Sequence, residues 1–360
     1  MTYWVQVARS KRVRLGNAKV LTLGQAEDTA RRVLVDPVAY EKEKHKAASL
    51  EDFIDEHYKP WATAHRKTAT ATLARLKASF GKKFYGQRLN EITLPALERW
   101  RTDRINSGTS TATVNRDLVA LSAVLTKAVE WNALDEHPLR KLKPLKVTSK
   151  VVRFLSADEE TRLRQALTRR DDALRQRREN GNAWRAERNL PLMPERGIYG
   201  DHLTPMTLLS INTGLRQGEV FTLRWADVDL DRRLLTVRAE VAKSGKLRIV
   251  NLNSEALRVL TTWKECAEST AGLVFPGPNR KPFVDVKKAW ATLLKDAEIE
   301  DFRWHDLRHH FASKFVMTGG DLNTLRELLG HADIKMVLRY AHLSSEHKAT
   351  AIERIAGGGA

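Results

Sequence analysis

The chain of 360 residues contains a single cysteine, Cys266, which restricts its chemistry. With one thiol, neither an intramolecular disulfide framework nor a cysteine-based zinc site can form, and such usage is typical of a reducing compartment. Cys266 lies beside Trp263 in an apolar stretch with helical spacing. We therefore expect a buried and unreactive thiol.

Long hydrophobic runs are also missing. No apolar stretch approaches the ~18 residues that span a bilayer, and the N-terminal stretch MTYWVQVARS ends in charge, unlike a secretory signal. We expect a soluble, cytoplasmic protein without a membrane partner. No internal repeat is present in the sequence.

Negative charge is scarce relative to positive charge. Lys and Arg total 62 against 44 Asp and Glu, a formal net charge of +18, and hydrophobic residues make up 42%. The hydrophobic content is enough for folded domains with sizeable cores. The basic excess is typical of proteins that bind a polyanion, most often nucleic acid, although some basic proteins bind nothing specific.

The N-terminal segment, residues 1–45, has the pattern of a small basic β-plus-helix domain. Residues 3–23 alternate as short strands do, with a turn at Gly16-Asn17, and a helix is expected over residues 25–35. This segment precedes a mainly α (α+β) chain.

Residues 46–140 carry helical signals throughout. Ser49 with Asp52 resembles a capping box, and helices are expected to begin near Thr93 and Thr111. These signals predict a compact helical domain, followed by a basic, proline-containing linker over residues 141–152.

The third domain is expected over residues 153–345, and a tail over residues 346–360. A capping box, Ser156 with Glu159, marks the first helix of the third domain, and residues 171–200 are predicted to form a surface insertion. Helices follow, with two strands predicted at residues 234–238 and 247–251. The prediction is a mostly helical domain that contains a small antiparallel sheet.

Two short segments of this domain are ambiguous alone. In TGLRQGEV (residues 213–220), Gly214 permits a sharp turn, and Arg216 and Glu219 share a helix face. Such a pair is usually a surface ion pair. The turn between the two strands holds Lys243 and Lys246, and a lysine in a hairpin turn is most often only solvated.

Two further segments contain imidazoles and a phenol. In HDLRHHFAS, His305, Arg308 and His309 share one helix face. His305 and His309 have the spacing of helical zinc ligands, but Arg308 would repel a cation, so we expect no metal. In LLGHADIKMVLRYAHLS, His331 follows Gly330, and Tyr340 alone would be assigned to a core.

Together the segments supply the groups that phosphodiester cleavage requires. Arg216 and Arg308 can stabilise the non-bridging oxygens of the transition state, because guanidiniums are planar and permanently charged. A phenol such as Tyr340 can attack phosphorus if cations or a base assist it. A lysine can protonate the leaving 5′ oxygen. The remaining groups assist by hydrogen bonding, proton movement or orientation: His305, His331 and Glu219.

The order Arg…Lys…His-x-x-Arg…His…Tyr, within TGLRQGE, HDLRH, LGH and RYAHL, resembles the phage-integrase family of tyrosine site-specific recombinases over residues 150–345. The resemblance implies six catalytic residues: Arg216, Lys243, His305, Arg308, His331 and Tyr340. Glu219 and His309 are expected to act through these residues. Lys246 remains the alternative general acid, because it shares the turn with Lys243. His310 stands where the family commonly has threonine.

The resemblance also implies a function. The chain would be an integrase that cleaves and rejoins double-stranded DNA through a covalent 3′-phosphotyrosine, and so would integrate or excise a phage or mobile element. No cofactor, metal ion or ATP is expected. Residues 1–45 would be an arm-type and residues 46–140 a core-type DNA-binding domain, four protomers would assemble on DNA, and an accessory DNA-bending protein is a further expected partner. The expected location is the bacterial cytoplasm or nucleoid, or the host cytoplasm for a phage protein.

Three alternatives share part of this interpretation. A resolvase of chromosome or plasmid dimers has the same active site, but the N-terminal segment argues against it. A tyrosine topoisomerase shares the chemistry without needing a specific site. A DNA-binding regulator with a decayed site is disfavoured, because every expected residue is present.

Overall fold

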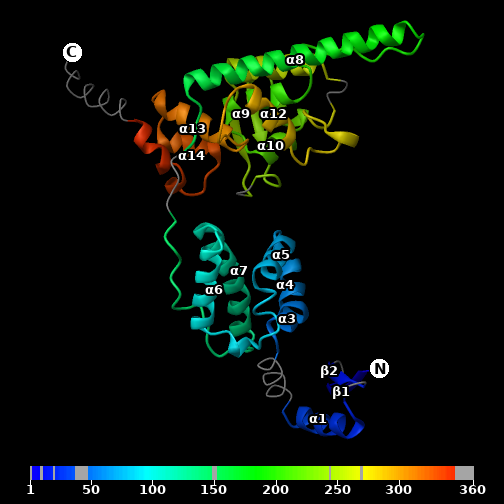
Figure 1. The fold of residues 1–360 in the computed structure, drawn as a ribbon, viewed down its shortest axis with the longest axis vertical. Coiled ribbons are helices and arrows are strands. Elements are labelled where there is room, and N and C mark those ends of the chain that lie inside the picture. The colour runs from blue at the N-terminus through cyan, green and yellow to red at the C-terminus, as the bar shows by residue number, and fades with distance from the viewer. Residues whose placement is uncertain are drawn as a thin grey trace, which may run out of the picture. The chain divides into compact units, whose positions relative to one another are not determined.

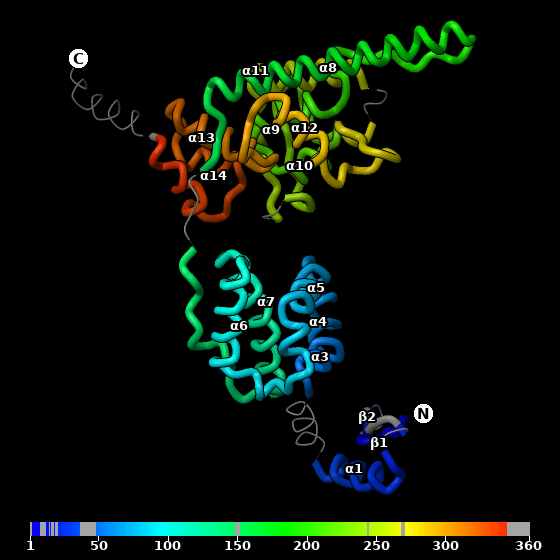
Figure 2. Tube along the Cα trace, viewed as in Figure 1, coloured from blue at the N-terminus to red at the C-terminus, as the bar shows by residue number. Residues whose placement is uncertain are grey.

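The computed structural model describes residues 2–8, 11–18, 21–36, 48–147, 152–242, 245–267 and 271–344. It divides into two compact units, residues 1–149 and 150–360, and each is described by itself (Figures 1 and 2). The predicted mainly α fold with small antiparallel sheets is confirmed. Among the described helices, none combines the length and apolar character needed to cross a membrane.

The N-terminal segment consists of an antiparallel hairpin and a helix: β1 (Thr2–Ala8), β2 (Lys11–Asn17) and α1 (Leu23–Val35). The predicted turn at Gly16-Asn17 is wrong. Gly16 pairs with Tyr3 inside the ladder, and Ala8 pairs with Lys11, so the strands connect between the latter two residues. The helix prediction is confirmed, and the helix begins at a cap on Thr22.

The helical part of the first unit consists of α3 (Leu50–Phe53), a π-helix (Ile54–Tyr58), α4 (Lys59–His65), α5 (Ala69–Phe80), a 3-10 helix (Leu89–Glu91), α6 (Leu94–Asn106) and α7 (Thr111–Glu130). The predicted starts are confirmed. Ser49 accepts a hydrogen bond of 3.1 Å from the backbone of Asp52, and Thr93 precedes α6. The core is aromatic, with Phe80 and Trp100 stacked at a centroid distance of 4.4 Å.

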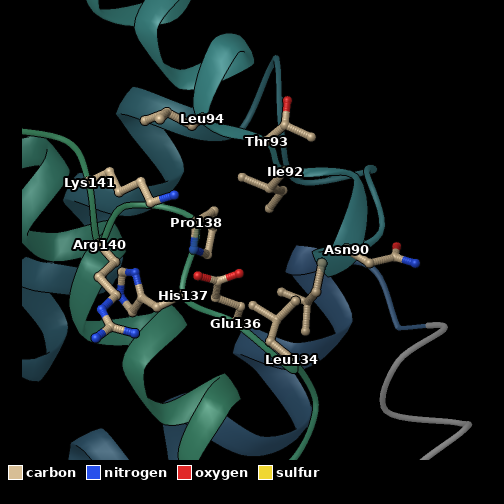
Figure 3. A pocket seen from close by; sticks show the side chains of 11 residues that line it. Asn90, Ile92, Thr93, Leu94, Leu134, Glu136, His137, Pro138, Arg140 and Lys141 are labelled. Carbon is tan, nitrogen blue, oxygen red and sulfur yellow. The ribbon is translucent and has the colours of Figure 1, made fainter.

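One cavity of about 310 Å³ lies in this helical part (Figure 3). Its walls come from the segment before α6 and from the residues that follow α7, where Glu136, Arg140 and Lys141 face it. None of the expected catalytic residues lines this cavity.

The second unit begins with its longest described helix, α8 (Ala157–Ala186), which starts at the predicted Ser156–Glu159 capping box. Residues 171–200, predicted as a surface insertion, form an arm, because α8 continues through more than half of them. The chain then returns along the helix: Asn182 exchanges hydrogen bonds of 2.8 and 2.9 Å with the backbone of Met193. Figure 1 shows α8 extending past the other helices of the unit.

The rest of the second unit packs around a buried central helix, α9 (Leu203–Thr213), which contacts α11 and α13. The other described elements are α10 (Gln217–Phe221), β3 (Val228–Asp229), β4 (Leu234–Val237), β5 (Arg248–Asn251), α11 (Ser254–Glu265), α12 (Lys287–Asp296), α13 (Asp306–Met317), α14 (Leu322–Leu329), and four 3-10 helices, η3 (Trp225–Asp227), η4 (Pro278–Arg280), η5 (Ile334–Met336) and η6 (Leu338–Ser344). The strands form an antiparallel sheet in the order β3-β4-β5.

The expectation of a buried Cys266 is wrong. The thiol-bearing residue is exposed, because α11 ends at Glu265 and Cys266 is the residue that follows it. The apolar spacing before it buries Val259 and Leu260 instead.

Candidate active site

Tyr340 lies in η6, and its ring belongs to a small core between α13 and α14. It packs with Val316, Leu329 and Val337, and only 2% of the residue is exposed. Its hydroxyl lies 2.6 Å from Nδ1 of His309. Tyr340 therefore has the packing of a core aromatic together with a hydroxyl held by an imidazole.

Arg308 is the buried centre of the site, with 4% exposure. Its Nη1 donates to the carbonyl oxygen of Gly214 at 2.7 Å, and its Nη2 donates to that of Leu329 at 2.5 Å. Both carbonyls lie at helix C-termini, which carry unpaired acceptors and partial negative charge. Burial and the charge of Arg216 lower the pKa of Arg308 to about 9, so its guanidinium stays charged at neutral pH.

Two glycines create these acceptor positions. Gly214 ends α9 and Gly330 ends α14, each in the left-handed region with φ of +62° and +63°. A side chain is strained at such angles. At Gly214 a Cβ atom would also lie 2.4 Å from Cδ1 of Phe311. The glycines of the TGLR and LGH segments thus allow the C-termini of α9 and α14 to lie within hydrogen-bonding distance of Arg308.

His331 follows Gly330 and contacts Arg308, with 3.0 Å between its Nε2 and Nη2 of the arginine. Because an arginine can only donate, Nε2 is the acceptor, and Nδ1 carries the hydrogen of the neutral ring. This Nδ1 is buried and has no partner within the described part of the chain. Burial and Arg308 lower the pKa of His331 to about 4.

Arg216 stands at the N-terminus of α10 with Glu219 behind it. Its Nη1 donates to Oε1 of Glu219 at 3.0 Å, and its backbone N–H donates to Oε2 at 2.8 Å. The Glu219 side chain is only 2% exposed. Burial raises its pKa, but the hydrogen bonds and charges of Arg248 and Arg216 outweigh burial and bring it to about 2.

The two arginines and the tyrosine line one cavity of about 400 Å³. The other lining residues are His305, His309, Gly330, His331, Ala332, Met336 and Arg339. Over the ranges that the structure describes, no three His, Cys, Asp or Glu side chains are arranged to hold a metal ion.

Before DNA binds, Tyr340 and His309 are both uncharged at neutral pH. Burial raises the pKa of Tyr340 to about 12, against the attraction of Arg339 and Arg308. Burial and His305 lower the pKa of His309 to about 4. At neutral pH, Tyr340 therefore donates a neutral hydrogen bond to Nδ1 of His309.

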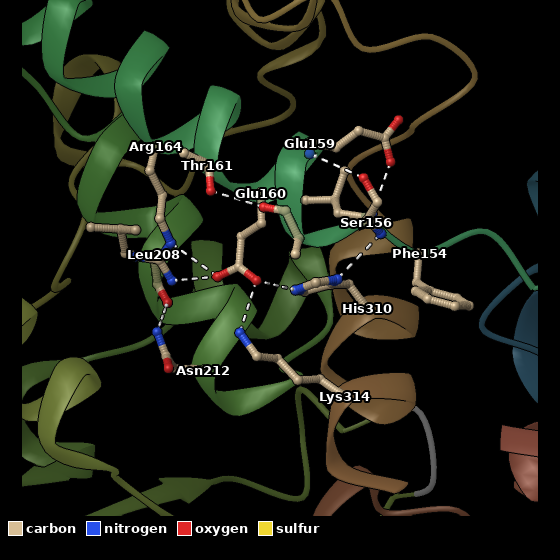
Figure 4. Close-up of polar contacts among 12 residues, drawn as sticks. Phe154, Ser156, Glu159, Glu160, Thr161, Arg164, Leu208, Asn212, His310 and Lys314 are labelled. Carbon is tan, nitrogen blue, oxygen red and sulfur yellow. Dashed lines mark hydrogen bonds and ion pairs between the residues drawn. The ribbon is translucent and has the colours of Figure 1, made fainter. Parts of the chain in front are cut away.

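A polar network fixes α13 to the start of the second unit (Figure 4). Nδ1 of His310 accepts from the backbone N–H of Leu155 at 3.2 Å, and its Nε2 lies 3.3 Å from Oε2 of Glu160. The same carboxylate accepts from Lys314 at 2.8 Å and from Arg164 at 2.9 Å. These contacts hold the helix that carries Arg308 and His309.

The structure brings together five of the six predicted catalytic residues: Arg216, His305, Arg308, His331 and Tyr340. Lys243 lies outside the described residues, and Lys246 is exposed. His309, which was expected to act through a catalytic residue, contacts the Tyr340 hydroxyl.

Sequence reasoning missed two arginines. Arg339 lines the cavity, and its position next to Tyr340 was the available signal. Arg248 binds Glu219 from β5, and no local motif marks it, because this pairing depends on how the sheet meets α10.

Comparison with known proteins places the chain in a family. Residues 200–347 match the phage integrase family, and residues 47–146 match the phage integrase N-terminal domain. The integrase of Salmonella phage P22 is 38% identical over 149 residues, which cover 38% of this chain and 38% of that relative. Tyrosine recombinase XerC of Xylella fastidiosa (strain M23) is 30% identical over 247 residues, which cover 67% of this chain and 73% of that relative.

Solved structures share the fold. The Tn1549 transposon integrase, in complex with a circular intermediate DNA, superposes with a TM-score of 0.65 at 16% identity, covering 86% of this chain and 99% of that one. The lambda integrase dimer bound to a COC′ core site gives a TM-score of 0.61 at 19% identity, covering 94% of this chain and 91% of that one.

The chain belongs to the phage integrase family of tyrosine recombinases. It is a site-specific DNA recombinase, as its sequence motifs predicted.

Proposed function

We propose that Tyr340 is the nucleophile of this recombinase and attacks a DNA phosphodiester held by Arg216 and Arg308. The observation that carries the proposal is the single cavity that both arginines and the tyrosine line. Tyr340 Oη would bond to phosphorus as the bond to the 5′ oxygen breaks, which leaves a 3′-phosphotyrosine. The reverse reaction rejoins the strand without an external energy source.

His309 is the group placed to receive the phenolic proton, because its Nδ1 lies 2.6 Å from the hydroxyl. Without DNA, the raised pKa of Tyr340 and the lowered pKa of His309 make this transfer unfavourable. A bound phosphate raises the pKa of His309, since its negative charge stabilises the imidazolium. DNA binding is thus part of the activation of Tyr340.

The other roles follow from charge and position. The Nδ1–H of His331, which has no partner among the described residues, suits a phosphate oxygen, and His305 lies at the same cavity. Lys243 is the proposed donor to the leaving 5′ oxygen, with Lys246 as the alternative, because an ammonium can protonate an alkoxide as it departs.

We further propose an integrase that integrates or excises a phage or mobile element. The hairpin and helix of residues 1–45 would bind arm-type DNA, residues 46–140 would bind the core site, and four protomers would assemble on two duplexes. In support, lambda integrase has been solved as a dimer on a core site and as a tetramer on a Holliday junction. The N-terminal hairpin favours this function over dimer resolution, and an accessory DNA-bending protein remains a proposed partner.

The decisive test is covalent trapping on a nicked suicide duplex that carries the recombination site, with EDTA present. We expect a 3′-linked protein–DNA adduct in the wild-type protein and none in Tyr340→Phe. The ring of Tyr340 packs in a core that phenylalanine also fills, so the variant is expected to fold. An adduct in Tyr340→Phe would overturn the assignment.

A further inference from the structure

Arg248 is a buried arginine of β5 that the proposed chemistry does not use. Its side chain is 8% exposed and forms a two-pronged ion pair with Glu219, with Nη1 to Oε1 at 2.9 Å and Nη2 to Oε2 at 2.6 Å. Its Nε donates to the carbonyl oxygen of Leu328 at 3.0 Å. All three nitrogens of the guanidinium are therefore bonded within the protein, and Arg248 does not line the cavity.

The carboxylate of Glu219 consequently has two cationic partners. It accepts two hydrogen bonds from Arg248 and, from Arg216, one from Nη1 and one from the backbone. In a buried pair of Arg216 and Glu219 alone, the two charges would cancel, and an incoming phosphate would meet little net attraction. With Arg248 included, the group of three carries one net positive charge.

We infer that Arg248 is a positioning residue that neutralises Glu219 and so leaves the charge of Arg216 available to the scissile phosphate. This inference rests on the proposed function, in which Arg216 binds that phosphate. Electrostatic stabilisation of this kind depends on charge that is held in place before the reaction begins.

Arg248 also joins three segments of the site. It extends from β5 to Glu219 on α10 and to the end of α14, where a Cβ atom on Gly330 would lie 2.8 Å from its Cδ. His331 follows that glycine. The arginine thus sets the distance between the segment that bears Arg216 and the turn that bears His331.

The test compares single-turnover cleavage of the nicked suicide duplex among Arg248→Met, Glu219→Gln and the double variant. Arg248→Met keeps the unbranched stem of the side chain but removes the guanidinium, which leaves the carboxylate to pair with Arg216 alone. We expect cleavage to slow by about 100-fold, the effect of losing one preorganised charge interaction. Adding Glu219→Gln removes the competing charge, and the double variant should recover at least about tenfold over Arg248→Met.

Arg170→Met is the matched control. Arg170 forms a two-pronged pair with Asp201 at 2.7 and 2.5 Å, away from the cavity, so its loss should not change the cleavage rate of folded protein. Arg248→Lys separates the effect of charge from that of geometry, because lysine keeps the positive charge but cannot form the two-pronged pair with Glu219. We expect its cleavage rate to stay within about tenfold of the wild-type rate. If Arg248→Met does not fold, Arg248→Lys still tests the inference.

Three results would overturn the inference: cleavage by Arg248→Met at the wild-type rate, no recovery in a folded double variant, or a loss in Arg248→Lys as large as that in Arg248→Met. If wild-type protein forms the Tyr340 adduct while Arg248 variants behave in one of these ways, only this inference fails. If wild-type protein forms no adduct through Tyr340, the proposed function fails, and the inference fails with it.

Discussion

Replacing Arg308 by alanine is expected to damage the fold as well as the chemistry. The substitution removes the donors to two buried carbonyls, those of Gly214 and Leu329. A buried polar group left without a partner costs about 1–3 kcal/mol, so the two together cost roughly 2–6 kcal/mol. For a unit of about 200 residues this corresponds to a fall in Tm of roughly 4–24 °C.

Arg216→Ala is the comparison that isolates this effect. The Arg216 side chain is 18% exposed and, among the described residues, donates one hydrogen bond, to Glu219, which keeps both bonds from Arg248. We expect a stability loss of about 1 kcal/mol at most. Both variants should lose cleavage by more than about 100-fold, while DNA retention persists because phosphate contacts elsewhere dominate affinity.

Differential scanning calorimetry of the two purified variants, together with suicide-duplex cleavage, measures both consequences. A large difference in Tm between them supports the role of Arg308 as the hydrogen-bond donor to the carbonyls at two helix C-termini. Equal Tm values, with cleavage lost in both, would refute the reasoning from the two carbonyls.

Two further predictions follow from the same site. His309 and His331 have folded-state pKa values of about 4, below the unfolded value of ~6.5. As the pH falls, the unfolded chain therefore binds protons before the folded chain does. The free energy of unfolding, measured with urea, should be complete above about pH 6.5 and fall toward pH 4 by at most about 3 kcal/mol per histidine. A flat profile in this range would contradict the pKa shifts. Gly214→Ala combines a left-handed φ with a Cβ atom 2.4 Å from Phe311, and should cost about 2–5 kcal/mol in thermal unfolding. Gly218→Ala, with open space around its Cβ position, is the control and should be close to neutral.

Local signals in the sequence predicted much of the fold. The Ser156–Glu159 box, the start at Thr111 and the two strands of the hairpin all lie where the residues place them. Each depends on neighbours a few positions apart, which a linear sequence displays directly. The predicted turn at Gly16-Asn17 is wrong because strand register decides where the two strands connect, and Gly16 pairs inside the ladder.

The candidate site was predictable where one segment holds several of its members. His305, Arg308 and His309 occur together, and their common face follows from helical spacing. The contacts between segments were not predictable: Arg308 to two helix ends, His309 to Tyr340, and Arg248 to Glu219. These depend on tertiary packing, and the bland assignment of Tyr340 to a core was also correct for its ring.

The position of Arg308 between two helix C-termini has a consequence for descent within this family. A copy that no longer cuts DNA loses the selection that acts on the Tyr340 hydroxyl and on Arg216, so phenylalanine can replace Tyr340 and Arg216 can drift with little effect on folding. Arg308 cannot drift as freely, because its loss leaves Gly214 and Leu329 with buried, unpaired carbonyls. In lineages that have become DNA-binding proteins only, this arginine should be retained after the recombinase activity has been lost.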